Sequence, residues 1–197
     1  MKLAAMEGLH KTGTGVPISV GGVYVDNELR YALNIPYGLS LLVTRDPYGR
    51  VIGLDSVPPA DRPPVNVTHL SYNAMVGIGT GLLLLALWLG WAWWRRRDIP
   101  RTPWFLRAVA VSGAAAVVAL ESGWVATEVG RQPWIVYQIQ RTSEAVSTAP
   151  GLRWGFYAVV AVYVVLTVMT VYVLRQLAGR HETLAPQEAE PEEVGVP

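Results

Sequence analysis

Three long apolar stretches constrain what this chain can fold into more than any other feature of its sequence. They cover about residues 70–94, 104–128 and 154–175. About 20 apolar residues in a helix cross the hydrocarbon core of a bilayer, and the first stretch holds no charged residue. Tryptophans gather at its end, as they do at membrane interfaces. The sequence therefore predicts an all-α integral membrane protein with three transmembrane helices, within a membrane region of residues 70–177.

The segments on either side of this region differ from it in composition. Residues 1–69 are rich in glycine and proline, which interrupt helices, so we predict an irregular region of turns and short strands there. Within it, residues 18–20 and 23–25 are expected to pair as a hairpin around a Gly-Gly turn. The last segment, residues 178–197, is rich in glutamate and proline and is predicted to be a disordered acidic tail.

The distribution of arginines predicts an orientation in the membrane. The loop between the first two stretches is rich in arginine, whereas the loop of residues 129–152 carries only Arg131 and Arg141. Because cytoplasmic loops are enriched in lysine and arginine, the first loop is predicted to be cytoplasmic. Residues 1–69 then form an extracytoplasmic loop, and the tail of residues 178–197 lies in the cytoplasm.

The polar N-terminal segment raises a question of how it crosses the membrane. The chain opens without a secretory signal. Such a segment would cross more easily if other membrane helices preceded it. We therefore expect this chain to be the C-terminal portion of a longer protein, or one half of a split protein that assembles with the other half.

Composition excludes several classes of function. The chain has no cysteine, which excludes disulfides, iron–sulfur clusters and thiolate metal sites. The formal net charge of +1 gives no basic surface for nucleic acid. The three histidines are scattered and lack the spacing of a zinc site.

Charged residues inside the second apolar stretch mark a candidate functional site. Glu121, Trp124 and Glu128 are spaced by three and four residues, so a helix places them on one face. A charge in a membrane segment costs about 2.5–3.5 kcal/mol on insertion scales, so such residues are functional candidates. The carboxylates could ligate a metal, relay protons, or form an ion pair such as Glu128 with Arg131. Trp124 could contact a cofactor or simply pack, and the sequence leaves these alternatives open.

Other candidates have both an ordinary and a functional interpretation. Met75, near the start of the first stretch, either packs against a neighbouring helix or ligates a haem iron through its thioether. Arg131 either reaches the lipid headgroups or neutralises a haem propionate. Lys2 and Glu7, taken alone, are typical of solvated residues at a helix start.

Four motifs, in order along the chain, resemble subunit I of the cytochrome bd quinol oxidases. They are Lys2-Leu-Ala-Ala-Met-Glu7, Gly53-Leu-Asp-Ser-Val-Pro58, Tyr72-Asn-Ala-Met-Val-Gly77 and Gly123-Trp-Val-Ala-Thr-Glu-Val-Gly-Arg-Gln-Pro-Trp134. The resemblance covers most of residues 1–177. It implies a quinol-binding loop of the short type, followed by the last three of nine transmembrane helices, in the bacterial cell membrane.

The resemblance implies roles at the outer face and at the low-spin haem. Lys2 and Glu7 match residues that bind and oxidise quinol, with Glu7 as the proton acceptor. Met75 matches the ligand of the low-spin haem b. Asn73 departs from the family pattern, because some members have an arginine there, and it is expected to change the electrostatics near that haem.

The resemblance also implies roles for the charged and aromatic residues on one helix face of the second stretch. Glu128 matches the acidic ligand of the high-spin haem b, and Trp124 matches a tryptophan between the haems. Arg131 matches an arginine near them. Glu121 is expected on a proton path to the oxygen site at haem d.

The function implied is that of a quinol:oxygen oxidoreductase, which oxidises membrane quinol and reduces oxygen to water. The implied partners are the N-terminal half of subunit I, which would supply the missing histidine ligands, the oxidase subunit II and membrane lipid. One rival interpretation is a non-enzymatic three-helix remnant or assembly protein without haem. Another is a quinol-binding module that serves a different oxidoreductase.

Overall fold

The computed structural model describes residues 1–147 and 149–184 of the chain. The chain divides into two compact units, of which the first is Met1–Val146 and the second begins at Ser147. The first unit holds the N-terminal segment, two long helices and the segment after them. The second unit holds the long helix α5.

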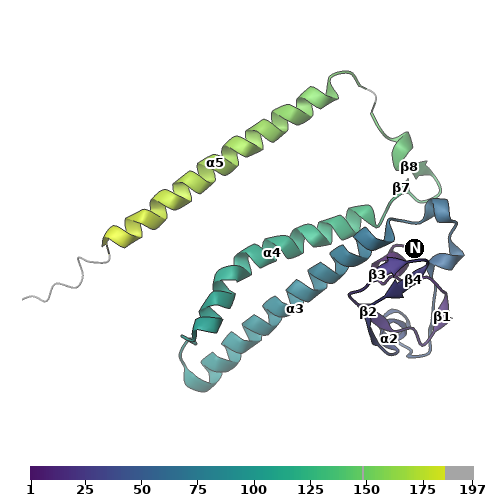
Figure 1. The fold of residues 1–197 in the computed structure, drawn as a ribbon, viewed down its shortest axis with the longest axis horizontal. Helices are drawn as coiled ribbons and strands as arrows, with labels where there is room; N and C mark the ends of the chain where they lie inside the picture. The colour runs from purple at the N-terminus through teal and green to yellow at the C-terminus, as the bar shows by residue number, and fades with distance from the viewer. Residues whose placement is uncertain (148, 185–197) are drawn as a thin grey trace, which may run out of the picture. The chain divides into compact units, whose positions relative to one another are not determined.

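Two long helices of the first unit pack side by side as an antiparallel pair (Figure 1). α3 spans Val65–Arg96 and α4 spans Pro103–Val129. Pro103 suits the first turn of α4, where a backbone N–H has no partner inside the helix. Near the loop that joins the helices, Trp88 meets Phe105 edge to face, with 5.2 Å between ring centroids. The start of α3 therefore lies beside the end of α4.

The N-terminal segment contains one long β-hairpin that is interrupted once along its length. Its four strands form two antiparallel ladders that share one register. The inner ladder joins β3 to β4, and the outer ladder joins β2 to β5. The bounds are β2 Ile18–Val20, β3 Val23–Val25, β4 Glu28–Arg30 and β5 Leu33–Ile35.

The predicted pairing of residues 18–20 with residues 23–25 is wrong, because the turn lies elsewhere. Asp26 and Asn27 both have positive φ, 53° and 63°, as a two-residue hairpin turn requires. Gly21, with a φ of 69°, lies in the interruption between the two ladders. The Gly-Gly pair is thus a break in a hairpin whose turn is Asp-Asn.

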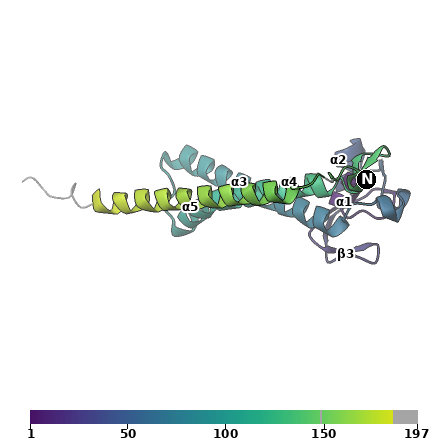
Figure 2. The same ribbon diagram turned by 90° about the horizontal axis from the view of Figure 1, so that it is seen from above.

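Short elements around two small apolar clusters complete the N-terminal segment, at one end of the α3–α4 pair (Figure 2). The buried residues of the clusters are Ala4, Ala5 and Leu54 in one and Val16, Leu39 and Val51 in the other. Leu9 packs against both clusters, so they form one continuous core. The elements are α1 Lys2–Met6, β1 Gly13–Thr14, α2 Gly38–Thr44, β6 Arg50–Val51, η1 Leu54–Ser56 and η2 Pro59–Asp61.

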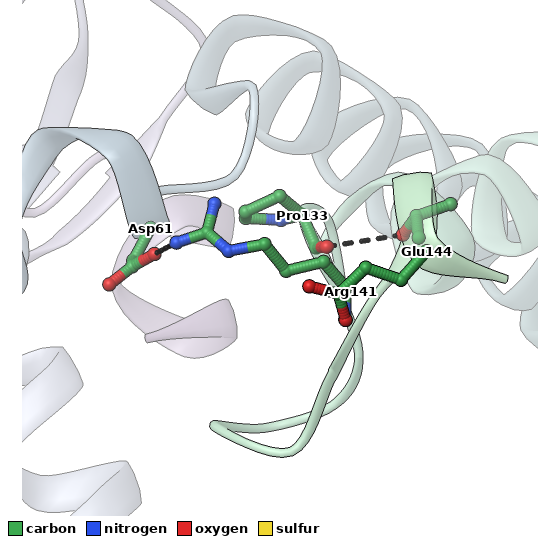
Figure 3. Close-up of polar contacts among 5 residues, drawn as sticks. Asp61, Pro133, Arg141 and Glu144 are labelled. Carbon is green, nitrogen blue, oxygen red and sulfur yellow. Dashed lines mark hydrogen bonds and ion pairs between the residues drawn. The ribbon is translucent and has the colours of Figure 1, made fainter.

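The segment that follows α4 folds back onto the N-terminal segment (Figure 3). The Arg141 guanidinium forms an ion pair with Asp61 of η2. It also lies over the Trp134 ring, 4.6 Å from the ring centroid. A Glu144 carboxylate oxygen accepts the Arg141 backbone N–H at 2.9 Å. The ion pair ties the segment to the η2 turn, and the other two contacts hold Arg141 within the segment. The elements of the segment are β7 Trp134–Val136, β8 Gln140–Arg141 and η3 Thr142–Glu144.

In the second unit, α5 spans Leu152–Leu184. Among the described residues, three helices are long and apolar enough to cross a membrane: α3, α4 and α5. This finding confirms the predicted all-α membrane fold with three spans. Residues 178–184, which the sequence analysis assigns to the disordered tail, continue α5 as a helix. Residues 185–197 lie outside the described residues, so the rest of the tail stays a prediction.

Candidate functional site

Lys2 and Arg131 line the same cavity, at the end of the helix pair where α1 meets α4. Lys2 is the first residue of α1, and Arg131 directly follows Gly130, the residue that caps α4. The cavity has a volume of about 550 Å³, and its wall includes Trp134 and Tyr137. Trp134 Nε1 is buried without a hydrogen-bond partner among the described residues. The positive charges of Lys2 and Arg131 beside these aromatic side chains could bind a planar ring that carries oxygen substituents.

Gly130 allows α1 to approach the helix pair closely. A Cβ added there would lie 3.1 Å from Lys2 Cγ and 3.1 Å from Thr68 Cγ2. It would also lie 2.6 Å from the Ala126 carbonyl oxygen. A glycine at the end of α4 therefore permits the contact that places Lys2 beside Arg131.

Glu7, directly after α1, is buried and borders a different cavity from Lys2. The residue is 3% exposed, and its Oε2 has no hydrogen-bond partner. Burial raises the pKa of Glu7 above its ordinary value of 4.5, while the Ser19 N–H, the charge of His69 and the Tyr72 hydroxyl lower it. Glu7 borders a smaller cavity of about 220 Å³. The structure thus brings Lys2 together with Arg131 and not with Glu7.

A row of polar side chains on α3 holds the hairpin against the helix. Asn66 accepts the Tyr24 N–H at 2.7 Å and donates to the Tyr24 carbonyl at 2.9 Å. Asn73 accepts the Gly21 N–H at 2.9 Å. The fully buried His69 contacts the Gly21 carbonyl at 2.8 Å. The side chain of Asn73, expected near a haem, is therefore engaged with the N-terminal segment.

Glu121, Trp124 and Glu128 lie on one exposed face of α4. Trp124 is 64% exposed in this chain, and both carboxylates are exposed. The ion pair considered for Glu128 with Arg131 does not form; the pairs found among the described residues are elsewhere. Exposed carboxylates on an apolar helix are costly in a membrane unless another group covers or binds them. This face of α4 is therefore suited to a contact outside the first unit.

Met75 lies between α3 and α4, half-buried against Gly123 of α4. A Cβ added at Gly123 would lie only 2.7 Å from Met75 Sδ. The glycine thus leaves room for the thioether at the centre of the helix contact. Nothing lies within 4 Å of a Cβ added at Gly77, two residues further along α3, so the backbone there is open to a neighbour.

Replacing Gly123 by Ala is expected to displace the Met75 side chain and destabilise the protein. Overpacking of this kind costs about 1–3 kcal/mol. Gly113 of the same helix has open space around it. The matched variant Gly113→Ala is expected to gain up to about 1 kcal/mol from helix propensity. Thermal unfolding in detergent compares the two variants, and equal unfolding temperatures would contradict the close Met75 contact.

The residues expected to ligate haem fit that role as single axial ligands. The Glu128 carboxylate forms no ion pair in the described part of the chain, and the Met75 thioether packs against a glycine. Within residues 1–147 and 149–184, no cluster of three or more His, Asp or Glu side chains could hold a metal ion alone. A thioether is a known haem ligand when a second ligand comes from elsewhere, and a carboxylate oxygen suits ferric iron. The Met75 thioether and the Glu128 carboxylate therefore suit a haem that helices from elsewhere help to bind.

The sequence comparison decides the family of this chain. Residues 1–182 match the family model described as cytochrome bd terminal oxidase subunit I. The chain belongs to this family. The match covers the N-terminal segment, α3, α4 and nearly all of α5.

Two Bacillus subtilis proteins are similar to this chain over most of its length. A Bacillus subtilis (strain 168) protein with the provisional name cytochrome bd menaquinol oxidase subunit I is 34% identical over 183 residues, which are 91% of this chain and 41% of that protein. A second protein of that organism, cytochrome bd ubiquinol oxidase subunit 1, is 30% identical over 87% of this chain and 40% of its own length.

A solved structure has the same fold. The bd oxidase from Geobacillus thermodenitrificans matches with a TM-score of 0.74 and 35% sequence identity, over 91% of this chain and 41% of that one. The chain thus spans about two fifths of the length of the cytochrome bd subunits that it matches.

Sequence analysis missed the positions of His69 and Trp134 in this cytochrome bd fold. It began the first span at residue 70, whereas α3 begins at Val65, so His69 is a helical residue four positions before Asn73. Two polar residues at this spacing share a helix face, and that pattern was the available signal. Nothing in the sequence pointed to the unpartnered indole of Trp134.

Proposed function

We propose that this chain forms part of a cytochrome bd-type oxidase, which oxidises membrane quinol and reduces oxygen to water. The observation that carries the proposal is the cavity of about 550 Å³ between α1 and the end of α4. Its two cations can bind the oxygen atoms of a quinol ring, and its aromatic wall can pack against the ring face. The names of the two Bacillus subtilis relatives, menaquinol and ubiquinol oxidase, support quinol as the substrate class.

The residues of the chain divide into binding and proton-transfer roles. Lys2 orients the quinol headgroup from the start of α1. Glu7, which borders a separate cavity, would take up the proton that quinol releases, because its buried Oε2 lacks a partner and burial raises its pKa. Glu121, on the exposed face of α4, would pass protons toward the site of oxygen reduction.

The cofactors proposed are a low-spin haem b, a high-spin haem b and haem d. Met75 would help to hold the low-spin haem b, and Glu128 the high-spin haem b. Trp124 supplies an aromatic surface beside Glu128, Arg131 a positive charge for a propionate, and Asn73 a polar group near Met75. Bound haem supplies the one-electron and oxygen chemistry that the side chains lack.

The proposed partners and orientation follow from the same arrangement. The N-terminal half of subunit I and subunit II would cover the exposed faces of the helices. Arg95, Arg96 and Arg101 lie at the end of the α3–α4 pair opposite the N-terminal segment, so this end is proposed to be cytoplasmic. The quinol cavity then opens on the outer side of the cell membrane.

The test is to purify the assembled complex through a tag on this chain and to record its absorption spectrum and quinol-dependent oxygen consumption. Glu128→Gln is expected to change the high-spin haem absorption, because a carboxamide is a poor ligand for ferric iron. Glu121→Gln, the matched change on the same helix face, is expected to leave that absorption in place. A chain purified without haem would favour the non-enzymatic remnant instead.

A further inference from the structure

His69 is buried at the junction of α1, α3 and the hairpin, and both of its ring nitrogens face carbonyl oxygens. Nδ1 lies 2.7 Å from the Met6 carbonyl oxygen, and Nε2 lies 2.8 Å from the Gly21 carbonyl oxygen. A carbonyl oxygen only accepts, so each ring nitrogen must carry a hydrogen to bond both partners. The uncharged Asn73 amide nitrogen is equidistant from the two ring nitrogens, 3.3 Å from each, above the ring. The contacts in the ring plane therefore favour the imidazolium form.

A buried imidazolium is stable only where negative charge lies nearby. Glu7 supplies that charge, since it directly follows Met6 and is itself buried. The charge of His69 acts to lower the pKa of Glu7, against the larger effect of burial. The other groups that act on Glu7 are the Tyr72 hydroxyl of α3 and the Ser19 backbone of the hairpin.

The link between His69 and Glu7 is also mechanical. The two side chains form no direct ion pair in the described part of the chain. Instead, the imidazole holds the Met6 carbonyl, which belongs to the peptide unit whose nitrogen is that of Glu7. The same ring holds Gly21 at the break in the hairpin. His69 therefore fixes the backbone on which the carboxylate of Glu7 stands.

We propose that His69 is a positioning residue for Glu7, which holds that carboxylate in place and favours its ionised form against the cost of burial, so that it can accept a proton from quinol. The inference rests on the proposed function, and it extends that function by assigning the group that prepares the proton acceptor. His69 itself touches no substrate. It acts through the Met6 peptide and through its charge.

The test measures quinol oxidation by the assembled complex against pH for wild type and for His69→Gln. The Gln side chain can still donate hydrogen bonds through its amide, but it carries no charge. Without that charge the pKa of Glu7 rises, so more of the acceptor is protonated at a given pH. The acid side of the kcat profile is therefore expected to move to higher pH, and kcat on that side is expected to fall about tenfold or more, with a smaller change in KM.

Two further variants separate charge from packing. Asn66→Ala removes two hydrogen bonds between α3 and the hairpin without any change of charge, and it is expected to leave the acid limb in place. His69→Lys retains a cation with several N–H donors, and its acid limb is expected to stay close to that of wild type. The haem absorption spectrum shows whether each variant assembles. If the Gln variant does not assemble, the test uses the Lys variant.

The outcomes distinguish this inference from the proposed function. An acid limb that is unchanged in His69→Gln, equally shifted in Asn66→Ala, or shifted in His69→Lys overturns the role of His69. The oxidase itself would stand in each of these cases. A wild-type complex that does not oxidise quinol at any pH overturns the proposed function, and the inference falls with it.

Discussion

Replacing Met75 by Leu is expected to abolish the low-spin haem absorption and to lower quinol oxidation by about 10²-fold or more, because even residues that only support metal ligands contribute 10–100-fold. Leu has nearly the volume of Met, and such exchanges in packed sites cost less than about 1.5 kcal/mol. The contact with Gly123 therefore survives the substitution. The substitution removes only the thioether sulfur, which can ligate haem iron and raise its reduction potential.

The measurement is the reduced-minus-oxidised absorption spectrum of the purified complex, with haem content per protein. Met169→Leu is the matched control, because Met169 lies on α5 and is 60% exposed in this chain. It is expected to leave spectrum and activity unchanged. A Met75→Leu complex that keeps its low-spin absorption would support the ordinary interpretation, in which Met75 only packs between two helices.

The three membrane-capable helices could be predicted because their signal is local. Length and apolar content decide whether a segment can cross a bilayer, and neither depends on distant contacts. The start of α3 was misplaced for a physical reason. Asn66 and His69 are polar, which suggests a loop, but their side chains bond to the N-terminal segment instead of to water. The sequence does not show such long-range partners.

The hairpin illustrates how two turn signals compete. The Gly-Gly pair is a strong turn signal, yet Asp26 and Asn27 form the turn. Both pairs tolerate positive φ. The choice between them depends on the bonds that α3 makes to Gly21 and Tyr24, which hold the break in the hairpin against the helix. The local sequence alone therefore does not show which of the two pairs forms the turn.

The candidate site could be predicted in part. Helical spacing places Glu121, Trp124 and Glu128 on one face of α4, and the structure has that face exposed. The separation of Lys2 from Glu7 was also within reach, since five residues on a helix correspond to about 140° around its axis. The cavity between Lys2 and the end of α4 could not be predicted, because it depends on packing between segments far apart in the chain.

Replacing Glu7 by Gln is expected to lower kcat for quinol oxidation by about 10²–10⁴-fold, the range for loss of a general base, with KM close to wild type. Gln has nearly the same shape as Glu, but its amide cannot take up a proton. Wild-type activity needs the ionised carboxylate, so it should fall as the pH is lowered through the pKa of Glu7, which burial raises above 4.5. The residual activity of the Gln variant should lack this acid limb.

The same substitution is expected to change how stability depends on pH. Because the pKa of Glu7 is raised in the folded protein, folding favours the protonated form. That contribution is complete at low pH and is lost as the pH rises through the folded-state pKa. Gln is neutral at every pH, so the variant should gain stability relative to wild type as the pH rises.

Thermal unfolding of both complexes across pH measures this effect, alongside the activity profiles. Glu28→Gln is the matched control, because Glu28 borders the same small cavity from β4 but is exposed. It is expected to match wild type in both measurements. If Glu7→Gln oxidised quinol as wild type does at every pH, Glu7 could not be the proton acceptor. A stability gain at high pH in that variant would then reflect only the cost of a buried carboxylate.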